Sequence, residues 1–384
     1  AVSKNKIPFN IHAPVRNSIW PVHLVDDEFR CGSLVSCTCR TDSDPPCYPF
    51  YDRHSLVRYR SSYLLADFAV FQGSLIVNTT KLFVLFALFS TSCVAFGQEA
   101  VFEEGVISTG DYESHPAFSV TGDTLYFLKM APDISTWTIC TSIRTNNTWS
   151  SPVVAPFSGR FRDGDPFITR DGKEFYFVSN RSFSGDSTKR DLDIWRMRKT
   201  AQGWSQPMRL PEPINSAADE YYPTLTDQGV LYFSSERGGG DANIYRSVPL
   251  NGSYFSVHKM GNQINSEFNE YEPFIAHDES YMIFMSTRPN GLTHGDLYFS
   301  QRINGVWQTA MVLPPPFNST GTEWSPSVSR DGKFVFFGST RSRSFHSDHA
   351  ETMEELNQRI NSAGNGLGDI YRVDFTVLKQ LIKL

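Results

Sequence analysis

The sequence has few cysteines, and they suggest neither a metal site nor a disulfide framework. Four of the six lie in the first 74 residues: Cys31, Cys37, Cys39 and Cys47. Their spacing lacks the paired C-x-x-C of a zinc site and assigns no disulfide pattern. Beyond Cys93 the sequence contains only Cys140. We therefore expect no internal disulfide after residue 97, and a β-rich domain of this size does not need one.

The sequence also lacks a basic stripe and the common catalytic motifs. Its formal net charge is −6, with acidic and basic residues interspersed, which disfavours a nucleic-acid partner. It contains no G-x-S-x-G and no H-E-x-x-H motif. The glycines at 238–240 lie in a turn rather than before a helix, so they do not form a phosphate-binding loop.

No apolar run is long enough to span a bilayer. The longest, KLFVLFALF at 81–89, has the length of the apolar region of a secretory signal, although a buried strand is the alternative. Small residues at Ala95 and Gly97 would permit cleavage before Gln98. We predict a signal peptide over 75–97 and a periplasmic or secreted chain without a transmembrane segment. Cys93 is an alternative site for a lipid anchor. Residues 1–74 would then be a non-native or disordered extension.

One unit is repeated five times in the remaining chain. Each copy has a short strand around a proline, a turn rich in Gly, Asp or Ser, and a second apolar strand. The five copies are YESHPAFSVTGDTLYF, RDGDPFITRDGKEFYF, DEYYPTLTDQGVLYF, NEYEPFIAHDESYMIF and SPSVSRDGKFVFF with the preceding TEW. They recur roughly every 50 residues, and the high aromatic content of 14% suits strands.

A third and a fourth strand follow in most copies, which predicts an all-β chain folded as a five-bladed β-propeller of four-stranded antiparallel blades. The last copy lacks its own fourth strand, and residues 99–108 resemble the end of one. We expect this N-terminal segment to close the ring. The predicted blades are 109–158, 159–215, 216–265, 266–318 and 319–384 with 99–108. A sixth blade from residues 1–74 remains an alternative.

The segment PSVSRDGKFVFFGSTR, with DIYR further along the same copy, closely resembles the WD40-like (PD40) repeats of TolB-type β-propellers. The resemblance covers residues 109–374. It implies an exported propeller but no particular activity, because the family hosts binding proteins, scaffolds and the propeller caps of hydrolases.

An acidic residue precedes each proline by three positions. The acids are Glu113, Asp163, Glu220, Glu270 and Glu323. An arginine ends the second strand in four copies: Arg181, Arg237, Arg288 and Arg341. A residue type found in every blade is most simply explained as structural, so we expect acid–arginine pairs that join strands or blades. A cation-binding ring of carboxylates is the alternative, so a divalent cation is the only cofactor suggested.

The residue directly before each proline differs between blades. Because a structural role would favour the same residue in every blade, different residues at these equivalent positions could together recognise one ligand. These residues are His115, Asp165, Tyr222, Glu272 and Ser325, and aromatic residues precede three of them: Tyr221, Tyr271 and Trp324. We expect His115, Asp165, Tyr222, Glu272 and these aromatic side chains to hold a ligand at the channel mouth that carries the acids.

Carboxylates and aromatic faces suit a saccharide-like ligand, and a protein partner from the envelope or the secreted fraction is the other candidate. The leading hypothesis is a non-catalytic binding or scaffold module. The alternative is a glycosidase-like enzyme that uses Asp165 and Glu272, which would need a suitable separation between the two carboxyl groups.

The fifth copy carries an insertion over 342–368. The pattern predicts a helix over 350–361, with Ser347 or Asp348 as its N-cap and Gly364 after its end. Three candidate metal ligands precede this helix: His346, Asp348 and His349. A lid or a docking element is the other interpretation.

Overall fold

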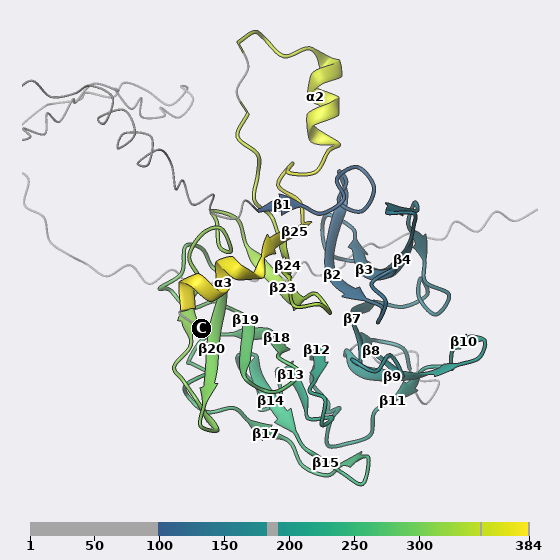
Figure 1. Ribbon diagram of the computed structural model, residues 1–384, viewed down its shortest axis with the longest axis vertical. Coiled ribbons are helices and arrows are strands. Elements are labelled where there is room, and N and C mark those ends of the chain that lie inside the picture. The colour runs from purple at the N-terminus through teal and green to yellow at the C-terminus, as the bar shows by residue number, and fades with distance from the viewer. Residues whose placement is uncertain (1–98, 183–190, 346–347, 383–384) are drawn as a thin grey trace, which may run out of the picture. The chain divides into compact units, whose positions relative to one another are not determined.

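The structure is a computed structural model that describes residues 99–182, 191–345 and 348–382 (Figure 1). All of these residues belong to one compact unit within 79–384. The predictions for the 1–74 extension, the signal peptide over 75–97 and the anchor at Cys93 lie outside the described residues. In the described part, no helix is long and apolar enough to cross a membrane.

The described residues form five antiparallel blade sheets, one from each repeat, and one separate two-stranded hairpin, which confirms the five-bladed β-propeller. Blade 1 consists of β2 (Tyr112–Phe118), β3 (Thr124–Met130), β4 (Trp137–Thr145), β5 (Thr148–Trp149) and β6 (Val153–Val154). Blade 2 consists of β7 (Asp163–Ile168), β8 (Glu174–Ser179), β9 (Asp193–Thr200), β10 (Gly203–Trp204) and β11 (Met208–Arg209). In both blades the outer strand is interrupted, and its two short pieces pair with the same third strand.

The other three blades follow the same order. Blade 3 consists of β12 (Glu220–Leu225), β13 (Leu231–Ser235), β14 (Asn243–Ser247) and β17 (His258–Lys259), with the added hairpin β15 (Pro249–Leu250) and β16 (Ser253–Tyr254). Blade 4 consists of β18 (Glu270–Ile275), β19 (Tyr281–Ser286), β20 (Asp296–Ile303), β21 (Val306–Trp307) and β22 (Met311–Val312). Blade 5 consists of β23 (Glu323–Val328), β24 (Phe334–Ser339), β25 (Asp369–Asp374) and β1 (Ala100–Val101).

The first strands of the blades form a closed ring. β2 contacts β7, β7 contacts β12, β12 contacts β18, β18 contacts β23, and β23 contacts β2. These five strands therefore surround the hub, as Figure 1 shows around the labels β2, β7, β12, β18 and β23.

The N-terminal segment closes the ring as the sequence predicted. β1 pairs antiparallel with β25, so residues 100–101 supply the outer strand of blade 5. The next residue, Phe102, is buried and makes edge-on ring contacts with Phe336 of blade 5 and Trp149 of blade 1. The closure thus joins the first and last blades through an apolar core as well as through backbone hydrogen bonds.

Each first strand carries a β-bulge at its proline. The pairing register with the second strand shifts at this point in all five blades. The residue before the proline adopts a left-handed conformation, with φ between 47° and 56°, in every case: His115, Asp165, Tyr222, Glu272 and Ser325. Non-glycine residues rarely adopt this conformation, so the bulge is a costly feature that the whole fold maintains.

Two helices accompany blade 5. α2 (Met353–Ile360) lies in the predicted insertion, but its N-cap is Thr352, not Ser347 or Asp348. The side chain of Thr352 accepts from the backbone of Glu355 and the Glu355 side chain accepts from the backbone of Thr352, a capping box that fixes the start of the helix.

α3 (Phe375–Ile382) was not predicted from the sequence. It buries Phe375, Val377 and Leu378 in a cluster with residues of blades 4 and 5, including Ile283 and Phe337. This helix therefore seals part of the junction between the last two blades.

Candidate functional site

The residues before the prolines meet at the hub and bind one another. The Nε2 atom of His115 lies 3.1 Å from Asp165 Oδ1 and 3.2 Å from Glu272 Oε1. Its Nδ1 atom lies 2.7 Å from the hydroxyl of Ser114. His115 and Asp165 are buried and Glu272 is 16% exposed. Three blades thus contribute to one ionic cluster.

Backbone amides complete this cluster. The amide of Tyr222 donates to Asp165 Oδ2 over 2.8 Å, and the amide of Ser325 donates to Glu272 Oε2. The hydroxyl of Tyr222 donates to the carbonyl oxygen of Pro326 over 2.7 Å. All five pre-proline residues are therefore held in one layer, which we call the hub layer: His115, Asp165, Tyr222, Glu272 and Ser325.

The electrostatics of the hub layer favour a charged imidazole. Burial alone would lower the pKa of His115, but the carboxylates of Glu272 and Asp165 outweigh it and raise that pKa to about 10. At neutral pH an imidazolium therefore lies between two carboxylates. The amide donors satisfy the remaining carboxylate oxygens, which lets a buried cluster with excess negative charge persist.

The acids that precede the hub layer are each paired within their own blade. Arg181 binds Asp163, Arg237 binds Glu220, Arg288 binds Glu270, and Arg341 binds Glu323, at 2.6 to 3.2 Å. A serine at the end of the second strand also donates to the same carboxylate, as Ser339 does to Glu323. All five acids are fully buried.

Blade 1 achieves the same neutralisation without an arginine. Lys129 occupies the second strand there, and its ammonium lies 3.0 Å from Glu113. Each carboxylate therefore has a basic partner among the described residues, so the acids serve to tie the strands of their own blade together.

Three aromatic residues of the expected site lie outside the hub layer, namely Tyr221, Tyr271 and Trp324. Tyr221 and Tyr271 pack edge-on at 5.7 Å between ring centroids, and both hydroxyls donate to Glu236. Trp324 packs against Tyr112 at 5.7 Å. These rings lie between neighbouring blades, because residues 221, 271 and 324 alternate with the hub-layer residues along their strands.

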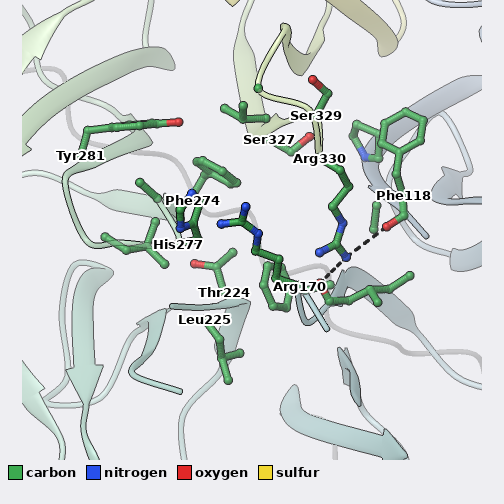
Figure 2. Close-up of a pocket in the computed structure, with 18 of the residues that line it drawn as sticks. Phe118, Arg170, Thr224, Leu225, Phe274, His277, Tyr281, Ser327, Ser329 and Arg330 are labelled. Carbon is green, nitrogen blue, oxygen red and sulfur yellow. Dashed lines mark hydrogen bonds between the residues drawn. The ribbon is translucent and has the colours of Figure 1, made fainter. Parts of the chain in front are cut away.

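A cavity of about 420 Å³ opens on the side of the hub layer that is opposite to the acids. Asp165 and Tyr222 contribute to its lining, and its walls include Phe118, Phe167 and Phe274. It reaches the turns between the first and second strands, so we call it the turn-side cavity (Figure 2). The sequence had suggested the other mouth of the channel for a ligand.

The rim of the turn-side cavity carries unlike residues at equivalent positions. The residues four positions after the five prolines are Val120, Arg170, Asp227, His277 and Arg330. Arg170, His277 and Arg330 line the cavity. Asp227 lies 3.4 Å from Arg170 and 3.3 Å from the ring of His277. The sequence interpretation missed these residues, although the comparison of equivalent positions would have found them.

Arg330 is held differently from the other basic residues of the rim. Its Nη2 donates to the carbonyl oxygens of Phe118, Ile168 and Thr169 at 2.8 to 3.3 Å. Among the described residues it forms no ion pair with a carboxylate within 4.0 Å. Burial and the positive charge of Arg170 lower the pKa of Arg330. Figure 2 shows Arg170 and Arg330 extending into the cavity.

The metal ligands expected in the insertion do not form a cluster in the described part. His346 lies outside the described residues. His349 is exposed and contacts the carboxylates of Asp348 at 2.8 Å and Glu355 at 3.1 Å. Across the residues that the structure describes, no group of three or more His, Cys, Asp or Glu side chains is arranged to hold a metal ion.

Comparisons with known proteins find only distant structural likenesses. No family model matches the chain, and no curated protein matches its sequence. A protein assigned as TolB from Agrobacterium tumefaciens is 15% identical, with a TM-score of 0.40 over 69% of this chain and 91% of that one. An α-L-arabinofuranosidase from Lactobacillus brevis is 11% identical, with a TM-score of 0.41 over 70% and 92%.

Prolyl oligopeptidase B from Galerina marginata is 14% identical, with a TM-score of 0.37, and the matched part spans 32% of that protein. These scores are too low to carry an argument about function. The fold is a five-bladed β-propeller, as the repeats predicted, because the sheet order itself establishes the five blades.

Proposed function

We propose that the protein is a non-catalytic binding module that holds its ligand in the turn-side cavity. The observation that carries this proposal is the chemistry of the rim, where five equivalent positions bear four residue types and three of these side chains line one cavity. A volume of about 420 Å³ lies in the usual range of small-ligand sites. Aromatic walls with a few polar groups are typical of such sites.

The hub layer supports a binding role rather than a glycosidase. A glycosidase needs two carboxylates on either side of the scissile bond. Here the imidazole of His115 lies between Asp165 and Glu272, and its Nε2 contacts both carboxylates. The two carboxylates are engaged by His115 and by backbone amides, so they support the floor of the cavity instead.

The ligand would be a saccharide-like molecule or an apolar segment of a partner protein from the envelope or the secreted fraction. The signal peptide that the sequence predicts over 75–97 supports this location, and an anchor at Cys93 is part of the same proposal. The negative net charge of the chain supports a partner other than nucleic acid.

A screen of glycans, peptides and small aromatic compounds against the full chain tests the proposal. Hits would be compared between the unaltered protein and Phe274→Ala, which removes a cavity wall, with Phe255→Ala at an exposed hairpin position as the matched control. We expect Phe274→Ala to weaken binding and Phe255→Ala to have no effect. Turnover of aryl glycosides that depends on Asp165 and Glu272 would contradict the proposal, as would hits that bind Phe274→Ala unchanged.

A further inference from the structure

The positive charge at the turn-side cavity is incompletely neutralised. Arg170 shares its charge with Asp227, which also contacts His277. Arg330 donates hydrogen bonds only to backbone carbonyls, and no carboxylate of the described residues pairs with it directly, although Asp171 and Asp227 attract its charge from further away. A buried or half-buried guanidinium normally has an anionic partner, because its desolvation is costly.

The carbonyl bonds fix where this charge lies. Only Nη2 of Arg330 donates to the carbonyl oxygens, which come from blades 1 and 2, whereas Arg330 itself belongs to blade 5. The guanidinium is therefore anchored across the channel, and its Nε and Nη1 have no hydrogen-bond partner in the described part of the chain. A side chain that is already held in place loses little conformational entropy when it binds an anion, so Arg330 is suited to bind a ligand.

A buried polar group without a partner lies in the same cavity. The hydroxyl oxygen of Ser327, three residues before Arg330, is buried without a hydrogen-bond partner among the described residues. Ser327 and Arg330 both line the turn-side cavity, and Figure 2 labels both. A native structure rarely leaves such a group unpaired, so a ligand oxygen at this place would satisfy it.

The acids at the rim limit the charge of the ligand. Asp278 accepts from Ser280, and Asp331 lies 3.0 Å from the exposed ammonium of Lys333. Both acids line the cavity together with Asp165. They would repel a dianion such as a phosphate monoester more strongly than a carboxylate with one charge. The aromatic side chains of Phe167, Phe274 and Phe118 favour an apolar group beside that charge.

We infer that the turn-side cavity binds a ligand with one carboxylate on an apolar body, and that Arg330 with Ser327 receives the carboxylate. This inference rests on the proposed function and specifies its ligand. Two sources have this chemistry, namely a small free carboxylate and the C-terminal residue of a peptide with an apolar side chain.

Calorimetric titration of the full chain with matched probes tests the inference. The probes are N-acetyl-L-phenylalanine, its uncharged amide, phenyl phosphate and a hexapeptide that ends in phenylalanine with a free carboxylate. We expect the acid to bind about tenfold more tightly than the amide, because a charged hydrogen bond is lost in the amide. Tighter binding of the hexapeptide than of the acid would assign the peptide source, and weaker binding the small carboxylate.

Variants separate recognition from folding. Arg330→Gln should remove the preference for the acid over the amide, and Arg144→Gln, an exposed arginine of blade 1, should keep it. Arg330 also joins blades, so Ser327→Ala provides a second variant in which no protein hydrogen bond is lost. We expect it to weaken binding of the acid several-fold with an unchanged melting temperature.

Equal affinity for acid and amide would overturn the inference, as would a preference for phenyl phosphate or a preference that Arg330→Gln leaves intact. If acid and amide bind equally and Phe274→Ala abolishes both, the proposed binding function stands and only the carboxylate assignment fails. If none of the four probes binds at millimolar concentration, the carboxylate assignment fails too, and the wider screen alone decides the proposed function.

Discussion

The Nε2 atom of His115 in blade 1 lies 3.2 Å from Oε1 of Glu272 in blade 4. These blades are not neighbours around the ring in the order of the sheets, so the contact crosses the hub. With Asp165 of blade 2 at 3.1 Å, the imidazolium ties three blades together where no apolar core reaches. The hub layer is therefore a structural element on which the turn-side cavity rests.

Replacement of His115 should destabilise the fold strongly. His115→Ala would leave Asp165 and Glu272 buried without their cation, and removal of one partner of a buried ion cluster typically costs about 3–5 kcal/mol. Urea unfolding at pH 7 would measure the loss. His258→Ala, at an exposed position of β17, is the matched control. A change of less than about 0.5 kcal/mol in His115→Ala would show that the cluster does not support the fold.

Stability should fall as the pH rises above neutrality. The pKa of His115 is raised to about 10 in the folded chain, above the usual value near 6.5 of an unfolded histidine. The folded state therefore binds this proton more tightly, so its contribution is complete below about pH 6.5 and is lost as pH approaches about 10.

The free energy of unfolding, measured between pH 6 and 10, should show a decline in the unaltered protein that His115→Gln lacks. A parallel decline in both proteins would assign the effect to other groups.

The acids that precede the hub layer should each stabilise their own blade. Glu323 accepts hydrogen bonds from Ser319, Ser339 and Arg341 and is fully buried. Glu323→Gln removes the charge that Arg341 neutralises and replaces one acceptor oxygen by a donor, which should cost about 2–4 kcal/mol. Thermal and urea unfolding would detect this loss, and Glu354→Gln on the exposed face of α2 should change stability by less than about 0.5 kcal/mol.

Closure of the ring should depend on Phe102. Its side chain is 5% exposed and contacts the rings of Phe336, Phe118 and Trp149. Phe102→Ala should destabilise the protein by about 3–5 kcal/mol, because it opens a cavity between the first and last blades. Hydrogen exchange should then increase first in β25 and β1. The exposed Phe255→Ala is again the control, and equal stability of the two variants would contradict a closure through Phe102.

The sequence predicted the fold well because the repeat is itself the structural unit. Five copies of a strand–turn–strand unit can bury their apolar faces only against one another, which leaves few architectures open. The missing fourth strand of the last copy predicted the closure by β1, since an unpaired edge is unfavourable.

The hub was predicted less completely. Because His115, Asp165 and Glu272 occupy equivalent positions in their repeats, the sequence predicted that they lie at the same height along the channel. The structure brings them into contact. Whether they face a ligand or one another depends on the left-handed bulge and on distances across the channel, which no local pattern encodes.

Other features were present in the sequence but were overlooked. The capping box of Thr352 and Glu355 marks the start of α2 more sharply than Asp348 does. Arg170, His277 and Arg330 occupy equivalent positions at which the five repeats differ, which is the same rule that singled out the hub layer.

The protonation state of His115 decides whether the hub layer is a supporting cluster or a free ligand site. Nitrogen chemical shifts of the histidine ring, recorded at pH 8 on uniformly labelled full chain and assigned with His115→Gln, report this state directly. We predict that both ring nitrogens of His115 carry a proton at pH 8, because Asp165 and Glu272 hold the imidazolium. A neutral His115 ring at pH 8, with only one protonated nitrogen, would contradict this view of the hub.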